Sequence, residues 1–240
     1  MKKIIKGWNW FEIIFLFVSV VVITIGFIVG ADRNWLSFVT SICGIFGVMF
    51  LAKGLVLAPY VLVVQAILYS ILSFTQKYYG EMIIYLALMT PMYTISIITW
   101  FKNRNKIDTS KVQINKIKGK EYLYLSFVTI AGTVAFYFIL RALNTNELIV
   151  STLSLSTSAV ATYLSLRRCS YYAIGFILND IILIILWSMS MAKHGIGYLP
   201  TVICFVLFLI NDIYGFIHWK IEEKKQQTET DQISPFSAQQ

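Results

Sequence analysis

Long apolar runs separated by short polar loops dominate the chain. Eight such runs occur, at 10–29, 35–52, 56–76, 82–101, 122–140, 148–166, 171–191 and 198–219. A helix needs about 20 mostly apolar residues to cross the roughly 30 Å of hydrocarbon in a bilayer. In lipid, a helix also satisfies its own backbone hydrogen bonds, whereas a β-barrel would show short alternating segments. The pattern therefore predicts an all-α membrane protein with eight transmembrane helices.

Both ends of the chain need a separate interpretation. The first run is longer than the apolar core of a signal peptide, and the Gly30-Ala31-Asp32 that follows it is a poor cleavage site. We therefore expect an N-terminal extra transmembrane helix within 1–30. The tail over 221–240 is polar, and we expect it to be disordered.

Basic residues are distributed unevenly between alternate loops. With both termini in the cytoplasm, 16 of the 20 Lys and Arg residues face inward, and only Arg33, Lys77, Arg141 and Lys193 face outward. An excess of Lys and Arg in inside loops sets the orientation of a membrane protein. We therefore expect a multi-pass protein of the bacterial cytoplasmic membrane with both termini cytoplasmic. Its longest loop, 102–121, is basic and faces the cytoplasm.

The composition agrees with this interpretation and excludes several classes of protein. Hydrophobic residues make up 58% and charged residues 13% of the chain, against about half and about a quarter in soluble domains. The net charge of +8 is explained by the topology, so we expect no nucleic-acid partner. Cys43, Cys169 and Cys204 form no paired motif, and two histidines suggest no metal site. We predict no enzyme activity, no metal and no cofactor.

Polar side chains inside the apolar runs are the candidate site residues, because such groups are costly in lipid. Asp180 lies in the middle of the seventh run, and its neighbour Asn179 points about 100° away on a helix, so we expect one of the two to face a path. Asp212 lies nearer the cytoplasmic end of the eighth run, where we expect partial solvation. The residues that we predict to line a substrate path are Gln65, Tyr69, Tyr85, Tyr93, Asp180, Trp187 and Asn211.

Two observations refine the expected architecture. Pro91 lies within the fourth run, where it removes a backbone hydrogen bond and favours a kink. The fourth run ends in SIITWFK and the eighth in GFIHWKI, each closed by a Trp and then a Lys. The two runs are four spans apart and therefore parallel. This similarity indicates parallel three-helix repeats joined by one connecting helix, an arrangement that places a substrate path between the two bundles.

Several segments resemble the PnuC family of nicotinamide riboside transporters. The segment 69–100 contains Tyr69, then Tyr79-Gly80-Glu81, then Pro91-Met92 and a closing Trp100, as in that family. The last run matches it at Asn211, Tyr214, Gly215 and Trp219, and Arg167-Arg168 precede the seventh run in the same way. The resemblance covers roughly residues 10–220.

The resemblance implies a three-plus-one-plus-three helix arrangement related to the SWEET sugar transporters, with an extra helix in front. In this chain the parts would be 31–101 (first three-helix bundle), 102–145 (basic loop and linker helix) and 146–220 (second three-helix bundle). It also implies facilitated diffusion of a vitamin precursor, which is trapped in the cell by phosphorylation.

The chain departs from the family pattern inside the runs. Tyr85 and Tyr93 stand where the family has Asn and Gln, and Gln65 stands where Asn is common. Ala173 and Phe176 replace tryptophans, and Ser96-Ile97 replace a Gly-Trp. Related members transport thiamine, riboflavin or deoxynucleosides, so these substrates stay open beside nicotinamide riboside.

We therefore expect a membrane transporter that moves a vitamin precursor or nucleoside by alternating access. In this interpretation the amides and Asp180 bind sugar hydroxyls, and the aromatic rings enclose the base. Its partners are a small-molecule substrate and the lipid bilayer, and homo-oligomerisation stays open. Proton coupling through Asp180 is a lesser alternative. A non-transporting accessory protein, whose polar residues only hold helices together, is the hypothesis from another class.

Overall fold

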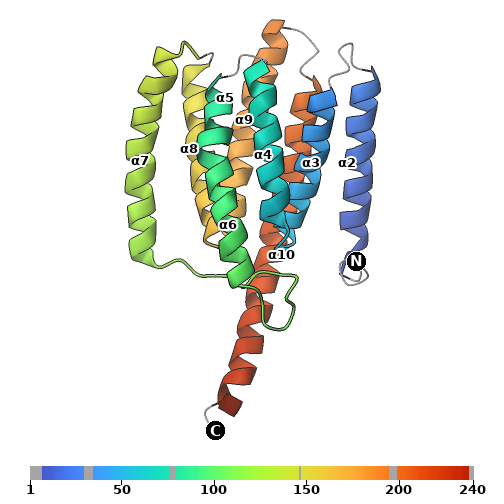
Figure 1. The fold of residues 1–240 in the computed structure, drawn as a ribbon, viewed down its shortest axis with the longest axis vertical. Coiled ribbons are helices and arrows are strands. Elements are labelled where there is room, and N and C mark those ends of the chain that lie inside the picture. Colours follow the sequence, from blue (N-terminus) through green and yellow to red (C-terminus); the bar gives the residue numbers. More distant parts are fainter. Residues whose placement is uncertain (1–6, 30–34, 76–78, 146, 195–198, 238–240) are drawn as a thin grey trace.

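The computed structural model describes residues 7–29, 35–75, 79–145, 147–194 and 199–237. Eight helices of this described part are long and apolar enough to cross a membrane, which confirms the all-α fold class and the eight predicted spans (Figure 1). In chain order the elements are α2 (Trp10–Val29), α3 (Trp35–Ala52), α4 (Ala58–Thr75), α5 (Tyr79–Ile83), η1 (Ile84–Met89), α6 (Thr90–Lys102), α7 (Gly119–Ala142), α8 (Leu148–Leu166), α9 (Tyr172–His194) and α10 (Leu199–Ser237).

The fourth span is built from three consecutive segments, α5, η1 and α6. The middle segment, η1, is a π-helix, and it ends at Met89, two residues before Pro91. The backbone N–H and the side-chain hydroxyl of Thr90 both donate to the carbonyl of Tyr85, five residues earlier. Short π-helical insertions often occur at functional sites. The disturbance predicted at Pro91 is thus present as a widened helical turn on its N-terminal side.

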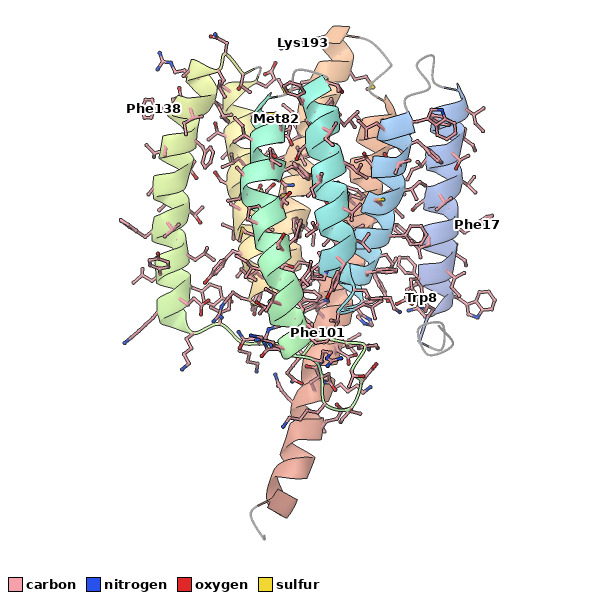
Figure 2. All side chains as sticks on the ribbon, viewed as in Figure 1. Trp8, Phe17, Met82, Phe101, Phe138 and Lys193 are labelled. Atoms are coloured by element: carbon pink, nitrogen blue, oxygen red, sulfur yellow. The ribbon has the colours of Figure 1, made fainter. Side chains whose placement is uncertain are left out.

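Two helices flank the central bundle on opposite sides, α2 at one edge and α7 at the other (Figure 1). α7 packs mainly on α8 and leaves large apolar side chains uncovered, among them Leu123, Phe127 and Ile130. Figure 2 shows such side chains pointing outward from both flanking helices, with Phe17 on α2 and Phe138 on α7 labelled. This apolar exterior suits a lipid environment.

A buried ion pair holds α2 to the rest of the protein. The ammonium of Lys53, in the turn after α3, lies 2.5 Å from the carboxylate of Glu12 on α2. The hydroxyl of Tyr214 on α10 donates to the second oxygen of that carboxylate over 2.6 Å, and the Lys53 ammonium also lies over the ring of Trp8. Burial lowers the pKa of Lys53, and the hydrogen bond to Glu12 opposes this shift.

The disorder predicted for 221–240 is wrong for most of that segment, because α10 continues as a helix to Ser237. At about 1.5 Å per residue, a helix of 39 residues is about 58 Å long and exceeds the membrane thickness. Its second half therefore leaves the bundle, at the end where α2 begins (Figure 1).

Contacts with the loop between α6 and α7 hold this extension in place. Gln226 accepts a hydrogen bond from the Ile114 N–H and donates to the Val112 carbonyl. Glu222 pairs with Lys111 of the same loop, and Glu223 accepts from the hydroxyl of Ser170 in the turn between α8 and α9. Sequence composition gave no sign of these long-range partners, and this explains the error in the prediction.

The two tryptophans that close the fourth and eighth spans are placed in equivalent ways. The Trp100 indole N–H donates to the carbonyl of Ser165, near the end of α8, and the Trp219 indole N–H donates to the carbonyl of Leu51, near the end of α3. Each tryptophan thus bonds the first helix of the other predicted three-helix bundle, and the two rings lie 5.9 Å apart. This reciprocity supports the parallel repeat, which stays a prediction.

Candidate functional site

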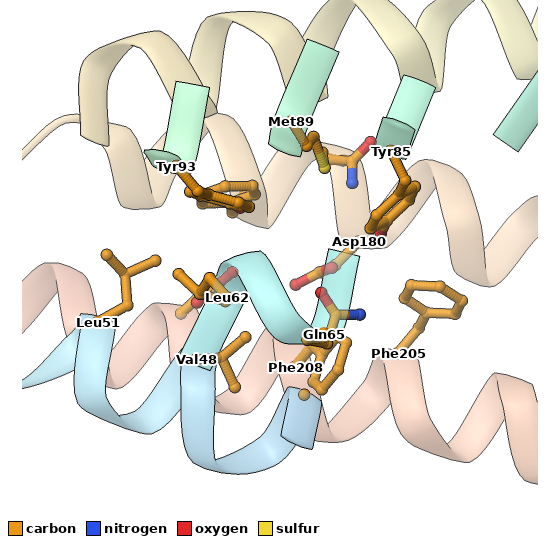
Figure 3. A pocket seen from close by; sticks show the side chains of 14 residues that line it. Val48, Leu51, Leu62, Gln65, Tyr85, Met89, Tyr93, Asp180, Phe205 and Phe208 are labelled. Atoms are coloured by element: carbon orange, nitrogen blue, oxygen red, sulfur yellow. The ribbon is translucent and has the colours of Figure 1, made fainter. Parts of the chain in front are cut away.

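A pocket lies within the central bundle, between five of its spans. Its walls come from α3, α4, the η1–α6 segment, α9 and α10, so that both predicted three-helix bundles contribute (Figure 3). The residues that line it are Gly44, Val48, Leu51, Leu62, Gln65, Tyr85, Met89, Tyr93, Phe176, Asn179, Asp180, Phe205, Phe208 and Asp212. The cavity has a volume of about 50 Å³, which is enough for a few water molecules.

The widened turn of the fourth span supplies one wall of this pocket. Tyr85, Met89 and Tyr93 follow one another at intervals of four residues, and all three face the cavity. The ring of Tyr69, on α4, packs against Tyr85 with a distance of 4.3 Å between ring centroids. Aromatic rings and one thioether thus form a surface on which a flat ring can pack.

Polar groups face this surface from the other helices. The side chains of Gln65 on α4 and Asp180 on α9 point toward one another across the cavity (Figure 3). Asp212 on α10 lies beside them, and its carboxylate accepts a hydrogen bond of 3.2 Å from the Asn211 amide. The side chains of Asp180 and Asp212 are each only 3% exposed, so two carboxyl groups lie within the membrane-spanning part of the protein.

Three hydroxyl groups of α8 fix the orientation of Asn179. Its side-chain oxygen accepts hydrogen bonds from Ser154 at 3.2 Å, Thr157 at 3.0 Å and Ser158 at 2.9 Å. Because the oxygen is saturated in this way and Asn179 lines the pocket, the amide NH₂ is the group of this side chain that is available to a ligand. The Ser/Thr run of α8 therefore positions a hydrogen-bond donor in the site.

The described part of the pocket wall is acidic and contains no basic side chain. None of the described residues that line it is Lys, Arg or His, whereas two are Asp. Within the described part of the chain, no group of three or more His, Cys, Asp or Glu side chains could hold a metal ion. The site is therefore acidic and aromatic, and it suits a ligand with a positively charged flat ring.

Four of the seven residues predicted from the sequence line this pocket, namely Gln65, Tyr85, Tyr93 and Asp180. The other three lie directly behind its wall. Tyr69 packs on Tyr85, and Trp187 belongs to a buried cluster with Phe205. Asn211 is fully buried and donates to the carbonyl of Val48, a residue of the wall.

Two expectations about neighbouring polar residues are corrected. Asn179 and Asp180 both line the pocket, although we expected only one of them to face it. Asp212 is buried in the pocket wall rather than partly solvated. The available signal was the tripeptide Asn-Asp-Ile, which occurs at 179–181 and again at 211–213.

Comparison with known proteins agrees with this architecture. A model of the family described as "Nicotinamide mononucleotide transporter" matches residues 34–221, which is most of the chain. The chain belongs to the nicotinamide mononucleotide transporter family. It is therefore a membrane transporter, and the predicted resemblance is confirmed.

Two individual proteins of this family show the similarity in more detail. The "Nicotinamide riboside transporter PnuC" of Neisseria mucosa is 27% identical over 221 residues, which cover 91% of this chain and 84% of that protein. The solved structure titled "Crystal structure of the Vitamin B3 transporter PnuC" matches with a TM-score of 0.80 and 26% identity, over 92% of this chain and 94% of that chain. The transporter fold of this family thus includes nearly the whole molecule.

Proposed function

We propose that this protein transports nicotinamide riboside across the bacterial cytoplasmic membrane without changing it chemically. The related protein from Neisseria mucosa is named for that substrate, and the similar solved structure is titled a vitamin B3 transporter. The family description names the mononucleotide instead. The two compounds differ by one phosphate group, so the charges of the pocket distinguish between them.

The acidic pocket without basic residues is the observation that carries this proposal. The nicotinamide ring of the riboside is a pyridinium cation, which Asp180 and Asp212 attract and the Tyr85 ring can stack on. The phosphate of the mononucleotide would meet the same two carboxyl groups, with no Lys or Arg among the described residues of the pocket wall to bind it. The pocket therefore favours the riboside over the nucleotide.

The remaining polar groups suit the other half of this substrate. The donor NH₂ of Asn179 and the amide of Gln65 can bind ribose hydroxyls or the carboxamide. Thiamine is the second candidate, because it also combines a flat ring with a positive charge. Riboflavin and deoxynucleosides are neutral, and the two carboxyl groups give them no comparable attraction.

Movement of the two predicted three-helix bundles would carry the substrate. A few water molecules fit in the present cavity, and a nucleoside needs the bundles to move apart. Rocking of parallel repeats around a central site provides alternating access to the two sides. We propose both termini in the cytoplasm, as the 16 inward-facing basic residues indicate. Net uptake then follows the substrate gradient, which phosphorylation inside the cell maintains.

Isothermal titration calorimetry on the purified full chain tests the substrate. We expect nicotinamide riboside to bind at least about tenfold more tightly than nicotinamide mononucleotide, because the phosphate adds repulsion and gains no partner. Thiamine, riboflavin and deoxyadenosine serve as comparison ligands. Equal or tighter binding of the mononucleotide would contradict the proposal, as would binding of riboflavin alone. Uptake of labelled riboside into proteoliposomes then tests transport.

A further inference from the structure

The two carboxyl groups of the pocket lie next to one another. Asp180 on α9 and Asp212 on α10 line the same small cavity, their side chains are close enough to interact directly, and each is only 3% exposed. A hydrogen bond between two carboxyl groups needs a proton, because two carboxylates have acceptors only. Two negative charges at this separation also repel each other strongly when they are buried.

Among the described residues that line the pocket, none supplies a compensating positive charge. The titratable groups that face the pair are Tyr85 of η1, Tyr93 of α6, Tyr172 of α9 and Cys204 of α10. All of them are neutral in their protonated forms. The described residues of α3 and α4 that line the pocket include no titratable group, and α8 contributes the hydroxyls that bond Asn179.

One oxygen of the pair has no donor. Oδ2 of Asp180 is buried and has no hydrogen-bond partner among the described residues, although the side chain points into the cavity (Figure 3). An acceptor that is left open and aimed at a pocket is suited to a ligand with positive charge. The same oxygen is suited to a proton while the pocket is empty.

We propose that the empty pocket holds one proton shared between Asp180 and Asp212, and that a cationic ring releases this proton when it binds. The inference rests on the proposed function, since the cation is the pyridinium ring of nicotinamide riboside. The charges balance. The empty pair with its proton has a charge of minus one, and two carboxylates with a bound cation have the same charge. The proton leaves to the water on the side to which the pocket is open.

This exchange makes binding depend on the pH of the side to which the pocket is open. A cation that binds from outside releases a proton outside, and the pair takes up a proton again once the cation has left. The proton therefore changes how tightly the cation binds on each side, and net uptake still follows the substrate gradient. External acid therefore competes with uptake, and it does so for cationic substrates only.

Calorimetry in buffers of different ionisation enthalpy measures the protons released on binding. We expect the full-length protein to release about one proton per nicotinamide riboside, and its affinity to rise by up to about tenfold per pH unit between pH 6 and 8. The reduced, dihydropyridine form of the riboside has almost the same shape and no charge. We expect it to release no proton and to bind with an affinity that is independent of pH.

A variant of one of the two carboxyl groups tests whether this pair is the source of the released proton. Asp212→Asn keeps the shape and leaves one carboxylate, and we expect the riboside to bind without releasing a proton. Glu229→Gln, on the α10 extension outside the pocket, is the matched control and should behave as the wild type. Wild-type protein that binds the riboside without proton release, or equal pH dependence for both forms of the ligand, would overturn the inference.

A measurement without ligand keeps this test separate from that of the substrate. The infrared difference spectrum between the wild type and the double variant Asp180→Asn/Asp212→Asn should contain the C=O band of a protonated carboxyl group at neutral pH. Absence of this band removes the shared proton, whatever the substrate proves to be. A band that is present, together with failure of the riboside to bind, would contradict the proposed function and leave the shared proton supported.

Discussion

Asn179 shows how a single residue can be prepared for binding by the helix next to it. Its oxygen is held by three hydroxyls of α8, so the amide cannot turn without losing these bonds. A donor that is fixed in advance loses little conformational entropy when a ligand arrives. The hydroxyls of Ser154, Thr157 and Ser158 therefore serve the site although they do not face it.

Replacing this residue by Leu should weaken substrate binding and leave the fold intact. Asn179→Leu removes one hydrogen bond to the ligand, worth about 1 to 1.5 kcal/mol, and we expect about tenfold weaker binding of nicotinamide riboside. Calorimetry gives the Kd, and thermal unfolding in detergent tests the fold. Ser156→Ala is the control, because Ser156 bonds Thr133 on α7 instead. A wild-type Kd in Asn179→Leu would show that this amide does not contact the ligand.

Single polar residues could be recognised from the sequence because lipid makes them costly. Gln65 and Asp180 were found in this way, and both line the pocket. The same rule led to Asn211, which is instead used to hold α10 against the carbonyl of Val48. The free-energy cost of a polar residue in lipid does not by itself distinguish a residue that binds a ligand from one that binds another helix. That distinction depends on which face of each helix meets the cavity.

At the scale of helices, close packing of α8 and α9 depends on a residue without a side chain. A Cβ atom on Gly175 would lie 2.9 Å from Cα and 2.8 Å from Cβ of Ala161 on α8. Small residues at such crossings allow the backbones of membrane helices to approach closely. The contact also keeps the hydroxyls of α8 within reach of Asn179.

We expect Gly175→Ala to destabilise the protein by about 1–3 kcal/mol, because backbone atoms must move to admit the methyl group. Gly132→Ala on α7 is a matched control, since nothing lies within 4 Å of a Cβ atom there. The control should unfold at the same temperature or slightly higher, because Ala favours helix by up to about 1 kcal/mol over Gly. Thermal unfolding followed by intrinsic fluorescence measures both. Equal stability of the two variants would argue against tight packing at this crossing.

The attachment of α2 can be tested through its buried ion pair. Lys53→Met leaves the Glu12 carboxylate, which is 1% exposed, without its cation, and we expect a loss of about 3–5 kcal/mol. The double variant Glu12→Gln/Lys53→Met removes both charges and should be more stable than the single one. Lys225→Met, which breaks an exposed pair with Glu229, should change little. A double variant as unstable as the single would show that the charges are not coupled.

For the whole molecule, the number of helices could be predicted from the sequence and their arrangement could not. Length and hydropathy determine how many helices can span a bilayer, and all eight are present. The positions of α2 and α7 at opposite edges depend on contacts such as Glu12 with Lys53, which pair residues 41 positions apart in the chain. The helical extension of α10 likewise depends on Gln226 and the distant loop that it binds.

Orientation in the membrane is the remaining property that the charge pattern predicts for the molecule as a whole. The loop between α6 and α7 lies at the same end of the bundle as the extension of α10, and the turn after α7 lies at the opposite end (Figure 1). Cytoplasmic termini therefore place Lys106 inside the cell and Arg141 outside. We expect a membrane-impermeant thiol reagent to label Arg141→Cys on intact cells and to label Lys106→Cys only after the cells are opened. The unsubstituted protein corrects for its own three cysteines, and labelling of Lys106→Cys on intact cells would reverse the topology.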